Sequence, residues 1–289
     1  MEKIVWIVIC LLLSGFRVSS LETDQPFYGT ETGEESLSQK DGSYVTTTVR
    51  GKLREDMEEF SFDIEAQLYD KNSTYRVRSV TVREGEETIQ VISVPELSLF
   101  GETAVWADDQ ENMGLELEDV NFDGYRDLRL FDTPNGNYLV EWIYLVWDPD
   151  RGQFVHDPRL NEIPLATFDQ EDQLIYGMQR GGAARHYFYT YEYQEGEPVM
   201  ICEEKSIYLP DPDSEAVRRC VHEKLGDGNV QVRDVCRETV EERNPETGEM
   251  EQTRDEFIFF LVKEDGIEET IIVEADSEME RLLGAEGEF

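Results

Sequence analysis

The chain has 289 residues, with 65 acidic against 26 basic side chains and a formal net charge of −39. Phosphate binding needs clustered Lys and Arg, so this balance excludes nucleic acid as a partner. Divalent cations and basic proteins remain as partner classes, although such a charge also serves the solubility of an exported protein.

The first residues have the pattern of a secretory signal peptide. A short start containing Lys3 precedes an apolar run from residue 4 to residue 13, and small residues lead up to Ser20. The run is shorter than the roughly 20 residues that cross a bilayer. No later segment is apolar enough for a membrane span. We therefore expect a signal peptide at 1–20 and a secreted or periplasmic protein.

The chain after the signal peptide alternates between short turns and strand patterns. Residues 21–43 are polar, acidic and without periodicity, which predicts a flexible leader. Apolar side chains then alternate from Phe60 to Leu68, and the alternation over 74–84 slips at Ser79, which predicts a β-bulge. Strand patterns recur to about residue 273. Ser277 and Glu280 form a capping box that predicts one short C-terminal helix.

These patterns predict an all-β, antiparallel fold that is propeller-like or sandwich-like. We expect a β-domain over 44–205 and a β-hairpin extension over 206–289 that is continuous with it. Cys220 and Cys236 flank a predicted hairpin around residues 226–229, so they are the candidate disulfide. With Cys202 the count after the signal peptide is odd, and one or no disulfide both fit.

The stretch "ELEDVNFDGYRDLRLFD", residues 116–132, has the spacing of a calcium loop. Asp119, Asn121 and Asp123 occupy positions 1, 3 and 5, Tyr125 offers its carbonyl, and Asp127 follows at position 9. Calcium prefers oxygen ligands, and carboxylates at alternate positions of a tight loop direct them inward. The alternative is an acidic hairpin turn without a metal.

An EF-hand is excluded by two features. Position 12 is Leu130 rather than a bidentate acid, and both flanks have strand patterns rather than helical ones. The loop therefore belongs between two strands, with the acid at position 9 closing the shell of ligands.

The segment "DVNFDGYRDL" resembles the calcium loop of FG-GAP repeats in integrin α-chains. It is more similar to a group of exported bacterial β-proteins that includes periplasmic inhibitors of invertebrate-type lysozyme. The segments "NYLVEWIYLVWDPDRGQFVHDPRL" (137–160) and "ATFDQEDQLIYGMQRGGAARHYFYTYEY" (166–193) follow the order of that group. The resemblance covers roughly residues 45–205. It implies a propeller-like β-fold with one structural calcium ion, held by the five loop residues named above.

The chain departs from lysozyme inhibitors in one respect. Several types of inhibitor insert an S-G-x-x-Y loop into the enzyme, and no such sequence follows residue 20. Inhibition of a cationic cell-wall hydrolase, which the acidic charge would attract, is therefore a second hypothesis rather than the first.

Two further segments each allow a structural and a functional interpretation. Residues 148–152, "DPDRG", form either a hairpin turn, which we favour, or a second cation loop. The aromatic side chains of residues 187, 188, 189, 191 and 193 either pack between sheets or line a groove for sugar or peptide. A calcium-dependent carbohydrate-binding protein is accordingly a third hypothesis.

Signals for an enzyme are missing. The sequence has no G-x-S-x-G, no H-E-x-x-H and no glycine-rich phosphate loop, and its three histidines stand alone. We therefore expect a non-enzymatic protein whose calcium ion is structural and whose surface binds another protein.

Overall fold

The computed structural model describes residues 43–68, 74–98, 105–106, 112–132, 142–209, 211–225, 230–263, 267–276, 279 and 283. These residues belong to a single unit of the chain, Thr32–Phe289. The expected signal peptide lies outside the described residues, as does the acidic leader apart from residue 43. Ser277 and Glu280 lie outside them too. Asp276 accepts a hydrogen bond from the amide of Met279 at 2.8 Å, as an N-cap residue does.

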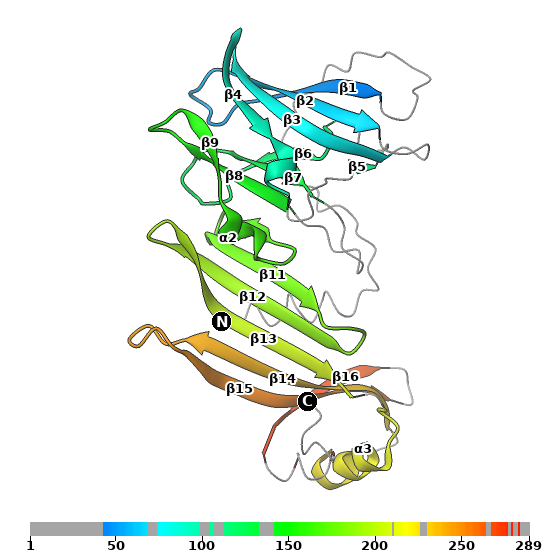
Figure 1. The fold of residues 1–289 in the computed structure, drawn as a ribbon. Coiled ribbons are helices and arrows are strands. Elements are labelled where there is room, and N and C mark those ends of the chain that lie inside the picture. The colour runs from blue at the N-terminus through cyan, green and yellow to red at the C-terminus, as the bar shows by residue number, and fades with distance from the viewer. Residues whose placement is uncertain are drawn as a thin grey trace. The chain divides into compact units, whose positions relative to one another are not determined.

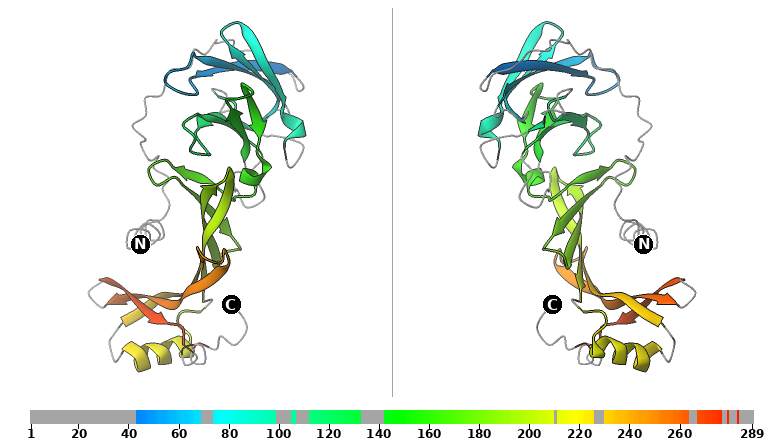
Figure 2. Two further views of the ribbon diagram at one scale, coloured as in Figure 1. Left: turned by 90° about the vertical axis from the view of Figure 1, so that its left-hand side faces the viewer. Right: turned by 90° about the vertical axis from the view of Figure 1, so that its right-hand side faces the viewer.

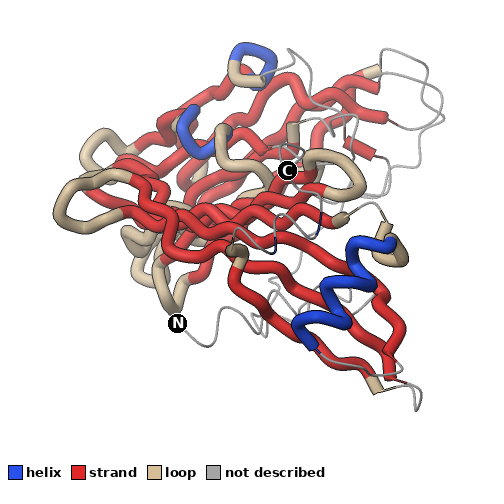
Figure 3. The backbone as a smooth tube through the Cα atoms, turned by 90° about the horizontal axis from the view of Figure 1, so that it is seen from below, coloured by secondary structure: helices blue, strands red, loops and turns tan. Residues whose placement is uncertain are grey.

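The all-β prediction is confirmed, because the described residues form three antiparallel sheets (Figure 1; Figure 3). Sheet A contains β1 (Tyr44–Gly51), β2 (Phe60–Leu68), β3 (Thr74–Glu84), β4 (Glu87–Ser93) and β5 (Val105–Trp106). Sheet B contains β6 (Leu115–Glu118), β7 (Asp127–Phe131), β8 (Trp142–Asp148) and β9 (Gln153–His156). Sheet C contains β10 (Thr167–Asp169), β11 (Leu174–Arg180), β12 (Arg185–Gln194), β13 (Glu197–Tyr208), β14 (Val230–Arg243), β15 (Met250–Lys263) and β16 (Glu268–Glu274).

Period-two alternation sets the register in sheet A. In β2 every second side chain is buried, from Phe60 to Leu68, as the sequence predicts. The register of β2 with β3 shifts between Glu65 and Ala66, so that no residue of β2 lies opposite Arg78 of β3. The bulge therefore lies one residue from Ser79, where the apolar phase changes.

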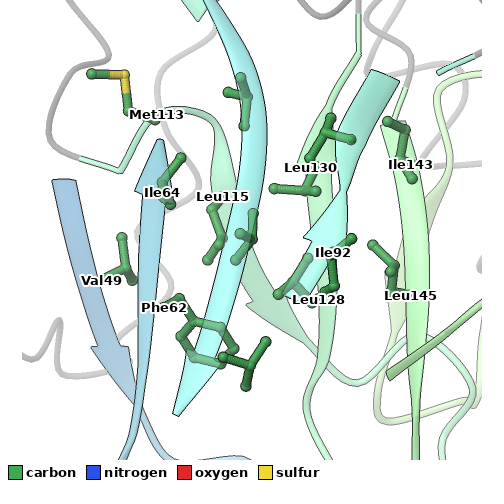
Figure 4. Close-up of a cluster of buried hydrophobic side chains, with 14 of the residues drawn as sticks. Val49, Phe62, Ile64, Ile92, Met113, Leu115, Leu128, Leu130, Ile143 and Leu145 are labelled. Atoms are coloured by element: carbon green, nitrogen blue, oxygen red, sulfur yellow. The ribbon is translucent and has the colours of Figure 1, made fainter. Parts of the chain in front are cut away.

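Sheets A and B bury one common core, which we call the A–B core (Figure 4). It combines Phe62 and Ile64 of β2 with Leu128 of β7 and Leu145 of β8, among other apolar side chains. The opposite face of sheet B packs into a second core, the B–C core. It contains Val120, Tyr144, Leu160, Ile163, Ala166 and Ile175. Sheet B is thus buried on both faces.

The prediction of a hairpin between Cys220 and Cys236 is wrong. Residues 215–225 are helical, as α3 (Glu215–Cys220) continued by the π-helical η3 (Val221–Leu225). The side chain of Ser214 caps α3 by accepting from the amide of Val217 at 3.2 Å. Figure 2 shows α3 beside β14 and β15. The buried apolar side chains at this contact form what we call the helix core: Val217, Cys220, Val221, Val232, Val235, Phe257, Phe259, Leu261, Met279 and Leu283.

The candidate disulfide between Cys220 and Cys236 is absent, because Cys220 lies in a helix rather than in a strand. Cys220 lies in the helix core beside Met279, with 3.5 Å between the sulfur atoms. Cys236 lies on β14 in a separate cluster with Ile258 and Phe260. The structure holds Cys202, Cys220 and Cys236 as free thiols. A helix in place of the first strand removes the cross-strand geometry that a disulfide needs.

The expected boundary near residue 205 falls inside β13, which pairs with β12 on one side and β14 on the other. Two further short helical segments lie among the described residues: η1 (Val94–Glu96) and α2 (Pro158–Asn161). Within the described ranges, no helix combines the length and apolarity that a bilayer crossing requires.

Candidate metal centre

The acidic loop 119–126 joins β6 to β7, so both of its flanks are strands, as predicted. The two strands pair from Leu115 opposite Leu130 to Glu118 opposite Asp127. Phe122 and Gly124 have positive φ angles of 61° and 85°. Glycine adopts this conformation at little cost, whereas phenylalanine is held there by its surroundings.

Two carboxylates of the loop accept hydrogen bonds from the loop's own backbone amides. Asp119 accepts from the amides of Asp123 at 3.2 Å and Gly124 at 2.9 Å. Asp123 accepts from the amide of Tyr125 at 2.8 Å and from the Nδ2 of Asn121 at 2.9 Å. The loop thereby holds its oxygen-bearing side chains on the inside of the bend.

Asp127 is the buried member of the set, with no exposed surface. Its two carboxylate oxygens accept from the amides of Val120 at 2.9 Å and Trp147 at 2.8 Å. Burial, together with the carboxylates of Asp123 and Asp119, raises the pKa of Asp127 to about 8 despite these hydrogen bonds. Burial also raises the pKa of Asp119.

The carboxylates of this loop have no cationic partner in the part of the chain that the structure describes. A buried carboxylate is ordinarily paired with a cation or coordinates a metal ion. Asp127 instead faces two further carboxylates, so the charge of the ionised loop is uncompensated.

The loop also contacts all three sheets. On the side of sheet A, the amide of Arg126 donates to the carbonyl of Leu53 at 2.7 Å. The guanidinium of Arg54 lies 4.2 Å from the centre of the Tyr125 ring. The bond from Trp147 to Asp127 ties the loop to β8 of sheet B.

Sheet C is reached through the other end of the loop. The Nε2 of Gln170, in the turn between β10 and β11, donates to the carbonyl of Asp119 at 2.7 Å. Val120 and Phe122 enter the B–C core, where the Phe122 and Phe168 rings lie 6.5 Å apart. The loop is therefore the junction at which the three sheets meet. The residues that complete this junction, Leu53, Trp147 and Gln170, carry no local signal in the sequence.

The candidate ligands of the loop have the chemistry that a calcium ion requires. All of its candidate ligands are oxygen atoms, which Ca²⁺ prefers. A carboxylate oxygen has two lone pairs, so one that accepts an amide can also bind a cation. Among the described residues, no three His, Cys, Asp or Glu side chains are gathered to hold a metal as they lie.

The second acidic segment, 148–152, is a hairpin turn between β8 and β9, as favoured from the sequence. Asp148 accepts from the amides of Asp150 at 3.0 Å and Arg151 at 3.1 Å, and Gly152 has a φ of 62°. Its hydrogen bonds are those of an ordinary Asp-initiated turn.

The aromatic run on β12 divides between the two faces of sheet C. Tyr191 and Tyr193 pack against the B–C core, and the Tyr193 hydroxyl donates to Asp157 at 3.3 Å. Tyr187 and Tyr189 continue the same face away from that core, because residues two apart share a face. Phe188 lies on the other face.

No family model matches the chain, and no curated protein matches it. Among solved structures, the chain is similar to one described as a Xanthomonas type IV secretion system related protein. The two share 17% sequence identity at a TM-score of 0.49, over 72% of this chain and 99% of the other. A likeness this distant says nothing about the residues of the loop.

Proposed function

We propose that this chain is a non-enzymatic, exported β-protein in which one calcium ion, bound by loop 119–127, stabilises a surface for another protein. Asp119, Asn121 and Asp123 would bind through side chains, Tyr125 through its carbonyl, and Asp127 as the closing acid. When bound, the ion would supply positive charge at the junction of the three sheets. Its role is structural rather than catalytic.

One observation carries this proposal: Asp127 is fully buried beside two carboxylates and has no cation among the described residues. Ionising such a group without compensation is costly. A divalent cation offsets that cost for all three acids at once. It also leaves in place the hydrogen bonds that Asp127 accepts from the backbone amides of Val120 and Trp147.

The substitution Asp123→Ala tests the site with little effect on the fold, because Asp123 is exposed. We expect saturating calcium to raise the melting temperature of the wild type by about 5 °C or more, through its binding free energy. The variant should lose that rise, while its melting temperature in chelator changes little. Thermal melts followed by circular dichroism, in calcium and in chelator, measure both.

Asp150→Ala is the matched control, since it removes an exposed acid from the other acidic turn. It should keep the full response to calcium. Equal destabilisation of Asp123→Ala in both buffers would contradict the metal assignment, since it would show that only the hydrogen bonds of Asp123 matter.

The partner that we propose is a basic protein, of which a lysozyme is one example. Two turns, β12–β13 and β14–β15, lie at one end of sheet C (Figure 1) and carry many exposed acids. They are Glu192, Glu195, Glu197, Glu241, Glu242, Glu246, Glu249 and Glu251. The negative electrostatic field of these acids accelerates association with a cationic surface. The association rate with basic lysozymes should therefore fall steeply with salt, and a rate independent of salt would exclude this surface.

A further inference from the structure

A basic patch lies on one face of sheet C, between the B–C core and the helix core. Residues directly opposite in antiparallel strands share a face. Ile207 of β13 lies opposite Arg185 of β12 and Arg237 of β14, and Lys205 lies opposite Tyr187 and Thr239. These six residues, which we call the Ile207 patch, are therefore neighbours on three adjacent strands.

The centre of the Ile207 patch is hollowed. Lys205, Ile207, Arg237 and Thr239 line a depression of about 90 Å³. Pockets that enclose a whole small molecule have roughly 300–1,000 Å³. The depression therefore has room for one charged group of a longer ligand, such as a carboxylate, and not for an entire ligand.

The charge of the patch is opposite to that of the chain. Arg237 is held by Asp255 through two hydrogen bonds of 2.8 and 2.7 Å. Arg185 and Lys205 form no ion pair with any residue that the structure describes. In a chain of net charge −39, two unpaired cations beside a third make this patch a site for an anion.

Aromatic and hydrogen-bonding groups border the hollow. The ring of Tyr187 covers Gly181, since its Cε2 atom lies 2.9 Å from the place where a Cβ on that glycine would stand. The Tyr189 hydroxyl donates to Gln179 at 3.2 Å, and Glu203 lies opposite Tyr189 on the same face. Aromatic rings alternating with amide, hydroxyl and carboxylate groups suit the ring faces and hydroxyls of a saccharide.

Other polymers fit this patch less well. Strands β12, β13 and β14 are each paired on both sides, so no free main chain is left to bind an added peptide strand. A nucleic acid would need many more cations than three and would be repelled by the rest of the chain. We propose that the Ile207 patch binds a carboxylate-bearing oligosaccharide, with a carboxylate in the hollow beside Lys205 and Arg237, on the side where Arg185 lies opposite Ile207, and with a sugar ring against Tyr187.

Calorimetric titration of the full chain with tetragalacturonate tests this proposal. The matched ligand is its methyl ester, which keeps the sugar rings and removes the charges. Chelator is present throughout, so that calcium neither bridges the ligand nor occupies the acidic loop. We expect the acid to bind and the ester to bind at least about tenfold more weakly, the effect of losing a charge-assisted hydrogen bond.

The double variant Arg185→Gln/Lys205→Gln should weaken binding of the acid about tenfold or more. Tyr187→Ala should do the same, and both variants should melt as the wild type does. The control Arg218→Gln/Arg219→Gln removes the same charge from exposed positions of α3 and should leave binding unchanged.

Four results would overturn the proposal: no binding of tetragalacturonate at millimolar concentration, equal binding of the ester, unchanged binding by the double variant, or equal binding of a tetraglutamate peptide. Because calcium is absent from the titration, these results leave the calcium proposal unaffected. Failure of calcium binding likewise leaves this site unaffected.

Discussion

Replacing Asp127 by alanine is expected to destabilise the protein by about 3 kcal/mol or more in chelator, and by more in calcium, because a calcium ligand is lost as well. The substitution leaves the amides of Val120 and Trp147 buried without an acceptor. Each buried donor left unpaired costs about 1–3 kcal/mol. Chemical denaturation gives the free energy of unfolding directly.

Asp127→Asn separates the hydrogen bonds from the charge. Its amide oxygen can accept one of the two bonds, so we expect an intermediate loss of stability together with loss of the calcium response. Asp150→Ala is again the control, with an expected change within about 0.5 kcal/mol. A loss no larger than that control in Asp127→Ala would show that the junction does not depend on this carboxylate.

Stability in chelator should fall as the pH rises from about 4 to about 8. The pKa of Asp127 is about 8 in the folded protein and near its ordinary value of 3.8 in the unfolded chain. Between these values the folded state binds the extra proton, so stability decreases with increasing pH. At about 1.4 kcal/mol for each pKa unit, the loss of stability should approach about 6 kcal/mol across the range.

Calcium should remove much of that loss, because it binds the ionised carboxylates. The difference in melting temperature between calcium and chelator should therefore be larger at pH 8 than at pH 5. In Asp127→Asn the slope in chelator should be shallower. A slope that is the same in the variant and the wild type would assign the effect to other buried acids, such as Glu204 and Glu118, whose pKa values are also raised by burial.

The strands and the loop were predictable because their signals are local. Alternation from Phe60 to Leu68 places one face in the core, and the D-x-N-x-D-G spacing fixes the bend at Gly124. The partners of the loop were not predictable. Leu53, Trp147 and Gln170 meet it only through the pairing and stacking of three sheets, and no local pattern records such contacts.

The helix at 215–225 was missed although its signals are local. Ser214 is a favourable N-cap, Glu215 follows it, and Arg218 and Arg219 lie in the last turn. Val217, Cys220 and Val221 recur at helical spacing and face the helix core. The apparent symmetry of two cysteines around a glycine-rich segment favoured a hairpin instead, and the disulfide prediction depended on that hairpin.

The proposed function depends on the binding of calcium by loop 119–127 at the junction of the three sheets. Calorimetric titration of calcium into chelator-treated wild-type protein at pH 8 tests it most directly. We expect one saturable site per chain that is absent in Asp123→Ala and retained in Asp150→Ala. An absence of binding by the wild type, or equal binding by Asp123→Ala, would contradict it and leave the loop as an acidic turn that joins the sheets without a metal.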